Sequence, residues 1–369
     1  MKRAAAAIVI AALAVTSCGS DDSSDATDDT ASPAVETDAP GDSEPVATEP
    51  AGTAPIDTAA QATPDDTTAS TPVDTTAPDA PAVEFPLTIE HRYGSTTLDA
   101  PPQTIVSLDT QWTDVLVALD APLAAAALDP SVEGGVFPWQ EGVPADVERI
   151  PVTNTIPYEA IAALQPDLIV ITYYATSEAD YELLSAIAPT IPLLGDEEVD
   201  TWQAIAEVAG QIVGDPQAAT DLIADAEQLS ADVLAELPGL EGKTYALANY
   251  VPGDAIYVVA DPDDGASAFF SQIGMTIDPD LLAIADGASG RVTLSLEQIG
   301  LLDADMLVLL TNGADPADIP GYDQLPAVQS GAVAILDIPD VSGLNTPTPL
   351  SVPYSLERIR AALEAVAGS

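Results

Sequence analysis

Two distant segments of the chain share one pattern of apolar and polar positions. In residues 158–172, a short amphipathic helix opens with Glu159, and a turn and a continuous run of apolar residues follow. Residues 296–310 repeat this order and open with Glu297. A continuous apolar run of this length is typical of a strand that is buried on both faces of a parallel sheet. The repetition therefore predicts two similar α/β lobes.

Other apolar runs continue the alternation of strands and helices. Residues 85–98 alternate as two strands that turn near Gly94, which predicts an opening hairpin. Strands that alternate with helices predict lobes with parallel-rich sheets. The buried strands are predicted at residues 105–108, 168–172, 244–248, 255–259 and 332–336, and the helices at residues 113–119, 178–188, 200–213, 267–273 and 353–366.

A long helix is predicted at residues 214–239. Asp215 and the proline after it form a helix start, and Pro238 ends the helix. A helix of about 22 residues is roughly 33 Å long, which is enough to pass from one lobe to another. A surface helix of a single domain is the alternative. The expected fold is therefore α/β, with two Rossmann-like lobes, at residues 85–213 and 240–369, joined by this helix and with a ligand cleft between them.

Residues 1–18 have the order of a bacterial signal sequence. Two basic residues come first, an apolar stretch runs through residues 4–15, and the single cysteine of the chain, Cys18, follows. The apolar stretch is too short to span a bilayer comfortably as a helix. The segment resembles a lipoprotein signal, in which the cysteine becomes the lipidated first residue, although Val15 stands where such signals usually have leucine. An ordinary secretory signal with an incidental cysteine is the alternative.

Residues 19–84 are predicted to be a disordered acidic tether. They contain no lysine, arginine, histidine or aromatic residue and consist mainly of Asp, Thr, Ala, Pro, Ser and Glu. Such a segment buries too little apolar surface to offset the entropy cost of ordering it. It would either hold the folded part away from a cell-wall layer or serve as a spacer with no length requirement.

The charge of the chain excludes one class of partner. The net charge is −52, with 60 acidic residues against eight lysine and arginine residues. Binding to nucleic acid is driven by basic residues that neutralise phosphates, so no nucleic-acid partner is expected.

The order of four motifs resembles a known family. Residues 104–119 look like an opening strand, loop and helix, the two repeats follow in turn, and residues 325–337 look like a late helix, turn and strand. Together they resemble the substrate-binding proteins of bacterial ABC importers for ferric siderophores, haem and cobalamin. The likeness covers roughly residues 85–365. It implies a rigid interdomain helix in place of a flexible hinge.

The resemblance also implies a role for the two repeat glutamates. In the family, the positions of Glu159 and Glu297 lie at the lobe tops and pair with arginines of a permease dimer, which works with a cytoplasmic ATPase. One glutamate per lobe suits two permease subunits. A carboxylate in the first turn of a helix is also favourable through the helix dipole alone, which is the structural alternative.

Few residues could carry catalysis or hold a metal ion. His91 is the single histidine, Cys18 is the single cysteine, and a glycine-rich phosphate loop is absent from the sequence. A cage for a free metal ion would need several histidines, and haem would need an axial ligand such as histidine or tyrosine. We therefore expect no enzyme activity, no resident metal and no cofactor, although tyrosine ligation of iron or haem stays open.

Aromatic residues at predicted strand ends are the candidates for ligand contact. Open α/β sheets bind ligands beyond the carboxyl ends of their strands, and aromatic walls suit a bulky chelate. Each such residue taken alone is more often part of the core or surface. Trp202, inside a helix, is expected in the core. The candidates are Trp112, Trp139, Tyr173, Tyr174 and Tyr250.

Arg291 is the candidate for contact with an anionic ligand. It lies on a polar loop before the second repeat, in a chain with few cations. A local salt bridge with a nearby acid is the alternative. One arginine in so acidic a protein favours a neutral, weakly charged or cationic chelate, such as a hydroxamate, over a highly anionic one.

The sequence patterns and the family resemblance together imply an extracytoplasmic, lipid-anchored and monomeric protein. The resemblance implies that it would capture a ferric siderophore and deliver it to an ABC importer. A cobalamin or other corrinoid carrier of the same fold is one alternative. A surface sensor or adhesion protein is a second alternative. A cell-surface enzyme is a third, and the absence of a nucleophile with a base argues against it.

Overall fold

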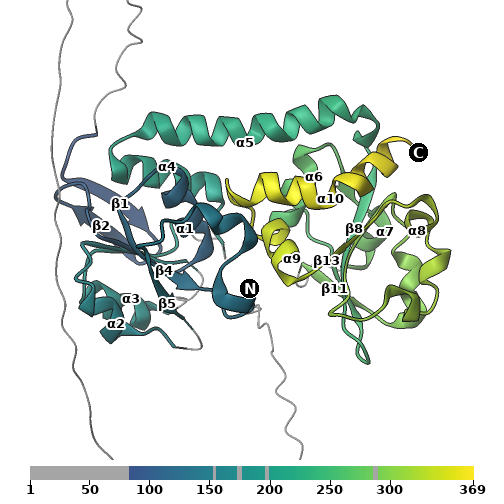
Figure 1. Cartoon of the computed structure of the whole chain (residues 1–369), viewed down its shortest axis with the longest axis horizontal. Coiled ribbons are helices and arrows are strands. Elements are labelled where there is room, and N and C mark those ends of the chain that lie inside the picture. The colour runs from purple at the N-terminus through teal and green to yellow at the C-terminus, as the bar shows by residue number, and fades with distance from the viewer. Residues whose placement is uncertain (1–82, 153–154, 173–176, 196–198, 286–289) are drawn as a thin grey trace, which may run out of the picture. The chain divides into compact units, whose positions relative to one another are not determined.

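The structure is a computed structural model. It describes residues 83–152, 155–172, 177–195, 199–285 and 290–369. They form two lobes, each built on one sheet with helices on its faces (Figure 1). Both lobes belong to one unit of the fold, Ala77–Ser369.

The hairpin predicted at the start of the folded part is present. Strands β1 (Leu87–His91) and β2 (Gly94–Leu98) pair antiparallel. Gly94 has a φ of +123°, a conformation that glycine adopts without strain. The hairpin is tied to the first lobe, because the Arg92 backbone N–H donates to the Leu193 carbonyl at 2.9 Å.

The first lobe has a five-stranded sheet in which all strands are parallel. The order is β5-β4-β3-β6-β7. Parallel strands buried on both faces read as continuous apolar runs, which is the pattern of residues 168–171. The strands are β3 (Ile105–Ser107), β4 (Leu123–Leu128), β5 (Glu148–Pro151), β6 (Leu168–Val170) and β7 (Thr190–Ile191).

Helices cover both faces of this sheet. On one face Ile105 and Leu168 pack in a cluster with Trp202 and other residues of α1 and α4. On the other face Val106 and Ile169 pack with residues of α2 and α3. The elements are α1 (Thr110–Ala118), α2 (Tyr158–Ala163), α3 (Glu178–Ser185), α4 (Trp202–Val213) and the 3-10 helices η1 (Glu133–Gly135) and η2 (Pro138–Gly142).

The second lobe has a six-stranded mixed sheet. Its main order is β11-β9-β8-β12-β13, and β10 also pairs with β8. Strands β10, β12 and β13 run parallel to β8, whereas β9 is antiparallel to both β8 and β11. The strands are β8 (Thr244–Tyr250), β9 (Ile256–Val259), β10 (Thr276–Ile277), β11 (Arg291–Leu294), β12 (Met306–Leu310) and β13 (Val333–Leu336).

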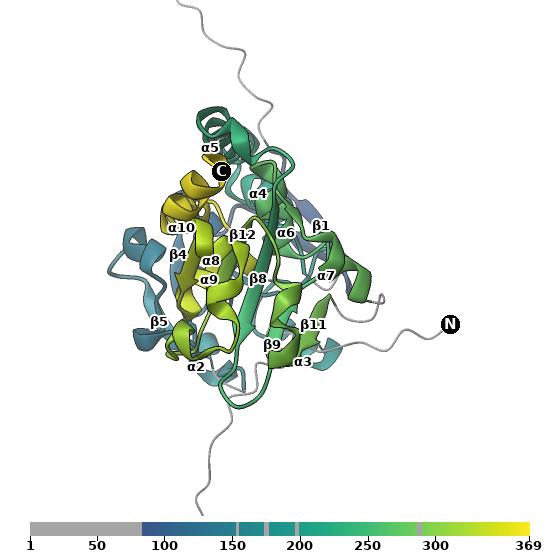
Figure 2. The same cartoon turned by 90° about the vertical axis from the view of Figure 1, so that its right-hand side faces the viewer.

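Figure 2 shows the second lobe from its end, with helices on both sides of β8. Its core combines the strands with Phe269 and Phe270 of α6 and with Ile359 and Leu363 of α10. The helices are α6 (Gly265–Gln272), α7 (Pro279–Ile284), α8 (Pro326–Ser330), α9 (Ile338–Asn345) and α10 (Ser351–Ala367), with short 3-10 helices η3 (Pro238–Leu240), η4 (Leu296–Leu301), η5 (Pro316–Asp318) and η6 (Tyr322–Gln324).

The long predicted helix is present as α5 (Pro216–Glu236) and contributes to the cores of both lobes (Figure 1). Ile223 and Ala226 pack in the cluster of the first lobe. Leu229 and Val233 pack in the cluster of the second lobe. One continuous helix therefore joins the two hydrophobic cores, which makes it a rigid connection.

Some elements differ from the sequence-based predictions. Strands β4 and β5 were not predicted from the sequence. Strand β4 is built largely from alanine and β5 contains a proline, so neither has the β-branched composition that is typical of a strand. Helix α1 begins three residues earlier than predicted, because Asp109 caps it and accepts a 3.0 Å hydrogen bond from the Trp112 N–H. The second repeat opens with the 3-10 helix η4 and not with an α-helix.

Candidate ligand site

The carboxyl ends of β3 and β6 are joined by a buried aspartate. Asp109, which follows β3, accepts hydrogen bonds at 2.7 and 2.8 Å from the backbone N–H and hydroxyl of Thr172, which follows β6. Burial raises the pKa of Asp109, although the hydrogen bonds from Trp112 and Thr172 favour its ionised form. Asp109 therefore fixes Thr172 at the carboxyl end of β6.

A second aspartate organises the chain beyond β7. Asp200 accepts hydrogen bonds from the backbone N–H groups of Leu194 at 2.8 Å and Gly195 at 3.3 Å. Burial raises the pKa of Asp200, against these hydrogen bonds and the charge of Arg92. Arg92 also donates from Nε to the Gly195 carbonyl at 3.2 Å. The strand ends of the first lobe thus carry fixed polar groups, as binding loops on a rigid sheet require.

Trp112 does not lie on a loop as predicted. It lies in α1, is fully buried, and packs with the core of the first lobe. Its Nε1 has no hydrogen-bond partner among the residues that the structure describes. The early start of α1 turns the indole toward the sheet, so Trp112 presents no surface to a ligand. Trp202, in contrast, lies in the core as predicted, with 5% exposure.

Trp139 is partly exposed and lies against residues of the second lobe. Its Nε1 donates to Asp114 at 2.8 Å. Its ring stacks on Phe137 with centroids 4.5 Å apart and approaches the ring of Tyr354, in α10, to 5.4 Å. Trp139 therefore belongs to a contact between the lobes and keeps a partly open surface.

The other predicted aromatic residues fall into two groups. Tyr173 and Tyr174 lie outside the described residues. Tyr250 was predicted on a loop but is the last residue of β8, where it is buried in the core of the second lobe. The reason is that β8 runs two residues further than the apolar run predicts. Asn312 helps to hold this strand end, because its Nδ2 donates to the Tyr250 carbonyl at 2.8 Å.

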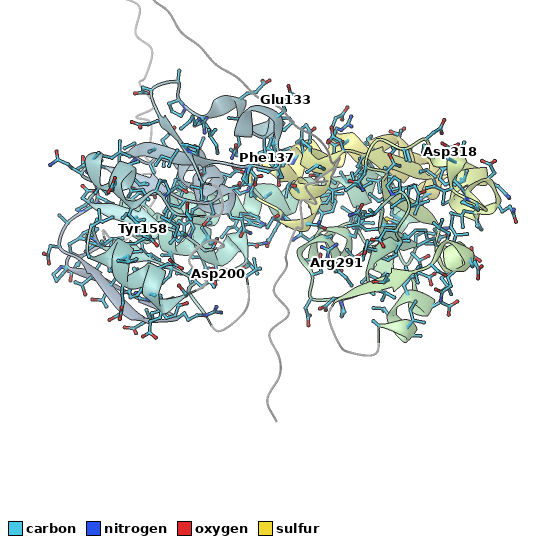
Figure 3. All side chains as sticks on the ribbon, turned by 90° about the horizontal axis from the view of Figure 1, so that it is seen from below. Glu133, Phe137, Tyr158, Asp200, Arg291 and Asp318 are labelled. Carbon is cyan, nitrogen blue, oxygen red and sulfur yellow. The ribbon has the colours of Figure 1, made fainter. Side chains whose placement is uncertain are left out.

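Arg291 is the first residue of β11. It makes a local ion pair, which was the alternative to contact with an anionic ligand. Its guanidinium lies 3.6 Å from Asp264, and its side chain is 36% exposed. Asp264 caps α6 by accepting from the Ala266 N–H at 3.0 Å. Figure 3 shows Arg291 on the second lobe, seen from the side opposite α5. Part of the Arg291 side chain is therefore exposed beside this ion pair.

Both repeat glutamates are exposed at the starts of short helices. Glu159 lies in the first turn of α2, and Glu297 lies in the first turn of η4. Helix α2 is held by Tyr158, whose hydroxyl donates to Asp180 at 2.7 Å. Burial, together with the hydrogen bond to Asp180, raises the pKa of Tyr158 to about 12. A capping box between Ser295 and Gln298 holds η4.

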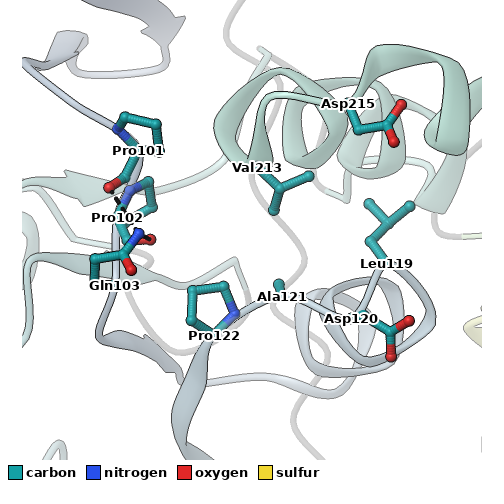
Figure 4. A pocket seen from close by; sticks show the side chains of 9 residues that line it. All are labelled: Pro101, Pro102, Gln103, Leu119, Asp120, Ala121, Pro122, Val213 and Asp215. Carbon is teal, nitrogen blue, oxygen red and sulfur yellow. Dashed lines mark hydrogen bonds between the residues drawn. The ribbon is translucent and has the colours of Figure 1, made fainter.

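Two cavities of the described part lie away from these residues. One of about 340 Å³ lies at the amino ends of β3 and β4, the opposite edge of the sheet from the loops above (Figure 4). A second of about 130 Å³ lies between α5 and α10. The described residues contain no group of three or more histidine, cysteine, aspartate or glutamate side chains that could hold a metal ion. The larger cavity is lined by Pro101, Pro102, Gln103, Leu119, Asp120, Ala121, Pro122, Val213 and Asp215.

Sequence reasoning missed the polar residues that support the site. Asp109 and Asp200 organise the strand ends, and Asp114 holds Trp139. In so acidic a chain, three more aspartates give no distinct signal. The position of Asp109 directly after a buried strand could have identified it, because the loops that follow parallel strands carry function.

Two α/β lobes joined by a single long helix define the class of two-lobed solute-binding proteins. The sequence profile of the family described as Periplasmic binding protein matches residues 105–339, which is more than half of the chain and includes parts of both lobes. The chain belongs to this family. Its members are substrate-binding proteins.

Three similar proteins agree with this assignment. The ferric enterobactin-binding periplasmic protein of Escherichia coli O6:H1 is 32% identical over 41% of this chain and 49% of its own length. A Bacillus subtilis (strain 168) protein named as an ABC transporter substrate-binding lipoprotein is 24% identical over 69% of this chain and 82% of its own. The crystal structure of PiaA from Streptococcus pneumoniae TIGR4 with ferrichrome has a TM-score of 0.63 and 22% identity, over 76% of this chain and 98% of that one. The last comparison shows the shared fold.

The chain spans about half the length of the ferric enterobactin-binding relative. Among the described residues, no helix is long and apolar enough to cross a membrane.

Proposed function

We propose that this protein captures a ferric chelate outside the cytoplasm and delivers it to an ABC importer, without catalysis of its own. The observation that carries the proposal is the 32% identity to a ferric enterobactin-binding protein, within a family match that includes parts of both lobes. The rigid connection through α5 supports capture with modest closure, because one helix enters both cores.

The ligand lies between the lobes in this proposal, against the loops that follow the strands of the first lobe. Trp139 supplies an aromatic surface, and Tyr173 and Tyr174 follow directly after Thr172, which Asp109 holds in place. Arg291 supplies a positive charge that Asp264 partly neutralises. A partly neutralised arginine favours a weakly charged chelate, such as a hydroxamate, over a highly anionic one.

The permease is the proposed protein partner. Glu159 and Glu297 are exposed, one on each lobe, and offer equivalent carboxylates to two permease subunits. The protein would act as a monomer, with a cytoplasmic ATPase supplying energy on the other side of the membrane.

Lipidation at Cys18 would anchor the protein to the membrane, and residues 19–84 would serve as a tether. The order of the first 18 residues supports this anchor, and so does the lipoprotein named among the relatives.

A thermal-shift screen of the purified protein tests the proposed ligand class. Ferric hydroxamate, catecholate and citrate chelates would be compared with their iron-free forms and with cobalamin. A ligand at about 100 times its Kd adds about 2.7 kcal/mol of stability, so a true ligand raises the melting temperature by several degrees. Stabilisation by cobalamin alone would assign the protein to the corrinoid carriers. No shift with any ferric chelate would contradict the proposal.

A further inference from the structure

A fully buried carboxylate lies where the two lobes meet. Asp114, in α1 of the first lobe, has no exposed surface. It accepts three hydrogen bonds: from Trp139 Nε1 at 2.8 Å, from Gln140 Nε2 at 2.7 Å and from the Thr348 hydroxyl at 2.7 Å. Three donors compensate for much of the cost of burying this charge.

These donors come from both lobes. Trp139 and Gln140 lie in η2 of the first lobe, whereas Thr348 lies between α9 and α10 of the second lobe. Thr348 is itself fixed, because its hydroxyl accepts from the Ser351 N–H at 2.9 Å, and its own N–H donates to the Ser351 hydroxyl at 2.9 Å. The partner of Asp114 in the second lobe is therefore held rigidly at the start of α10.

The ring of Trp139 is contacted by residues of the same two lobes. Phe137 stacks on it with an interplanar angle of 13°, and Tyr354 approaches it from α10. Gly343, in α9, comes so close that a Cβ atom there would lie 3.1 Å from the indole. The hydrogen bond to Asp114 sets the rotation of an indole that these neighbours already confine.

We propose that Asp114 is a positioning residue, which orients Trp139 and fixes the first lobe to the second through Thr348. The ionised carboxylate holds both donors on a single oxygen, Oδ2. Asp114 thereby links the orientation of the Trp139 ring to the spacing of the lobes. Its effect on ligand affinity rests on the proposed function, whereas its hold on Trp139 and Thr348 does not.

The groups that surround Asp114 are mostly neutral. Trp139 and Gln140 face it from η2, and Thr348 faces it from the segment before α10. Helix α4 packs against α1 through apolar residues such as Ile205. Within the described part of the chain, the charged group that acts on Asp114 is Asp109, at the start of the same helix. Burial raises the pKa of Asp114 to about 6, against the hydrogen bonds from its three partners and with a smaller contribution from Asp109.

Protonation must change the hydrogen bonds of this carboxyl group. The indole N–H and the amide NH₂ can only donate, so neither can accept a hydrogen bond from the protonated carboxyl group. The Thr348 hydroxyl can reverse its role and accept. A protonated Asp114 thus keeps a hydrogen bond to Thr348 but binds Trp139 through a weaker, neutral acceptor. The orientation of Trp139 should therefore depend on pH with a midpoint near 6.

The test is a pH titration of tryptophan emission in the ligand-free protein from pH 5 to pH 8. The wild type should show a change of emission wavelength with a midpoint near pH 6. The change should disappear in Asp114→Asn, which keeps the shape but does not titrate, and in Trp139→Phe, which retains the signals of Trp112 and Trp202. Persistence of the transition in either variant, or its absence from the wild type, would overturn the proposal.

His91→Gln is the matched control, because His91 is a titratable side chain of the hairpin, and burial lowers its pKa from the ordinary value. Its transition should equal that of the wild type, and loss of the transition in this variant would assign the signal to His91. If Asp114→Asn fails to fold, Thr348→Val replaces it. That variant should raise the amplitude or shift the midpoint, because the protonated carboxyl then lacks its acceptor, and a titration identical to the wild type would overturn the proposal.

A ligand arm separates this inference from the proposed function. A ferric chelate that stabilises the wild type should bind Asp114→Asn at least severalfold more weakly above pH 7, while below pH 5 the two affinities converge. Equal affinities at every pH would overturn the effect on the ligand site. If no ferric chelate binds the wild type, the proposed function fails, and the ligand-free titration still decides the role of Asp114.

Discussion

The carboxylate of Asp167 accepts a 2.8 Å hydrogen bond from the backbone N–H of Thr104, and Asp305 accepts the equivalent bond from Thr244 at 2.9 Å. Asp167 and Asp305 end the turns of the two sequence repeats. Thr104 directly precedes β3, and Thr244 is the first residue of β8. The repeat visible in the sequence is therefore also a repeat of one structural device, which fixes the start of a strand in each lobe.

Removing either aspartate should destabilise its lobe. Asp167→Ala leaves the N–H groups of Gln103 and Thr104 without their carboxylate, and Asp305→Ala does the same to Thr244 and also removes the ion pair with Lys243. Because these groups are partly exposed, we expect a loss of about 1–2 kcal/mol for each variant. Urea unfolding followed by circular dichroism measures it. A change below a few tenths of a kcal/mol would show that the device carries no stability.

The stability that Asp305 contributes should disappear in acid. Burial works to raise its pKa, but the hydrogen bonds from Thr244 and the charge of Lys243 outweigh burial, so the pKa is lowered. The contribution is therefore present above the ordinary carboxyl pKa and is lost as the pH falls through the lowered value. The difference in unfolding free energy between wild type and Asp305→Asn should be constant near pH 7 and shrink below about pH 4. A difference that grows on acidification would reverse this account.

A methyl group at Gly343 should disturb the contact between the lobes. The added Cβ would lie 2.9 Å from the Ser355 hydroxyl and 3.1 Å from Trp139. Gly343→Ala should therefore shift tryptophan emission and cost about 1–3 kcal/mol through overpacking. Gly300→Ala is the control, because a Cβ there meets no atom within 4 Å. Equal effects of the two substitutions would mean that the approach to Trp139 is not tight.

Variants of Glu159 and Glu297, the two glutamates proposed to dock with the permease, should separate uptake from binding. Glu159→Ala with Glu297→Ala should leave ligand affinity nearly unchanged and reduce uptake roughly tenfold, since the proposed attraction to permease arginines would be lost. Reversal of both to arginine should reduce uptake further through like-charge repulsion. Uptake of the radioactive ferric ligand into cells gives the comparison.

Glu207→Ala provides the control for charge, because Glu207 is an exposed glutamate of α4 outside both repeats. It should leave uptake unchanged. A double variant that loses ligand affinity while uptake per bound ligand is normal would place the two repeat glutamates at the ligand and not at the permease.

Anchoring should depend on Cys18. Cys18→Ala should move the protein from the membrane fraction to the soluble fraction, with an unchanged melting temperature of the folded part, because the variant lacks the thiol that lipidation requires. Fractionation and immunoblotting measure this. Membrane retention of the variant would leave the apolar residues 4–15 as the anchor.

The sequence predicted those helices and strands whose residue composition matches their burial and their ends in the structure. Strands β6 and β12 are continuous apolar runs buried on both faces, and α5 has its cap and its terminating proline. Strand β4 was not predicted, because its alanines have low strand propensity. It is held in the sheet by pairing with its neighbours β3 and β5. Tertiary pairing of this kind leaves no local signal.

The candidate site was harder to predict, because a shift of a few residues in an element's boundary moves a side chain from a loop to the core. The predicted boundaries placed Trp112 before α1 and Tyr250 after β8, whereas the structure includes each residue in that element. The contact of Trp139 with Tyr354 joins residues far apart in the chain, which no local pattern can show. The exposure of Glu159 and Glu297 follows from their helix starts, so it could be expected from the sequence.

Equilibrium titration of the purified protein with a ferric chelate tests the central claim most directly. Quenching of tryptophan emission would be followed for the wild type and for Trp139→Leu, with the iron-free chelate and cobalamin as comparisons. The account predicts saturable binding of at least one ferric chelate at micromolar concentration or below, with weaker quenching or affinity in Trp139→Leu. Saturable binding of cobalamin with no response to any ferric chelate would contradict it.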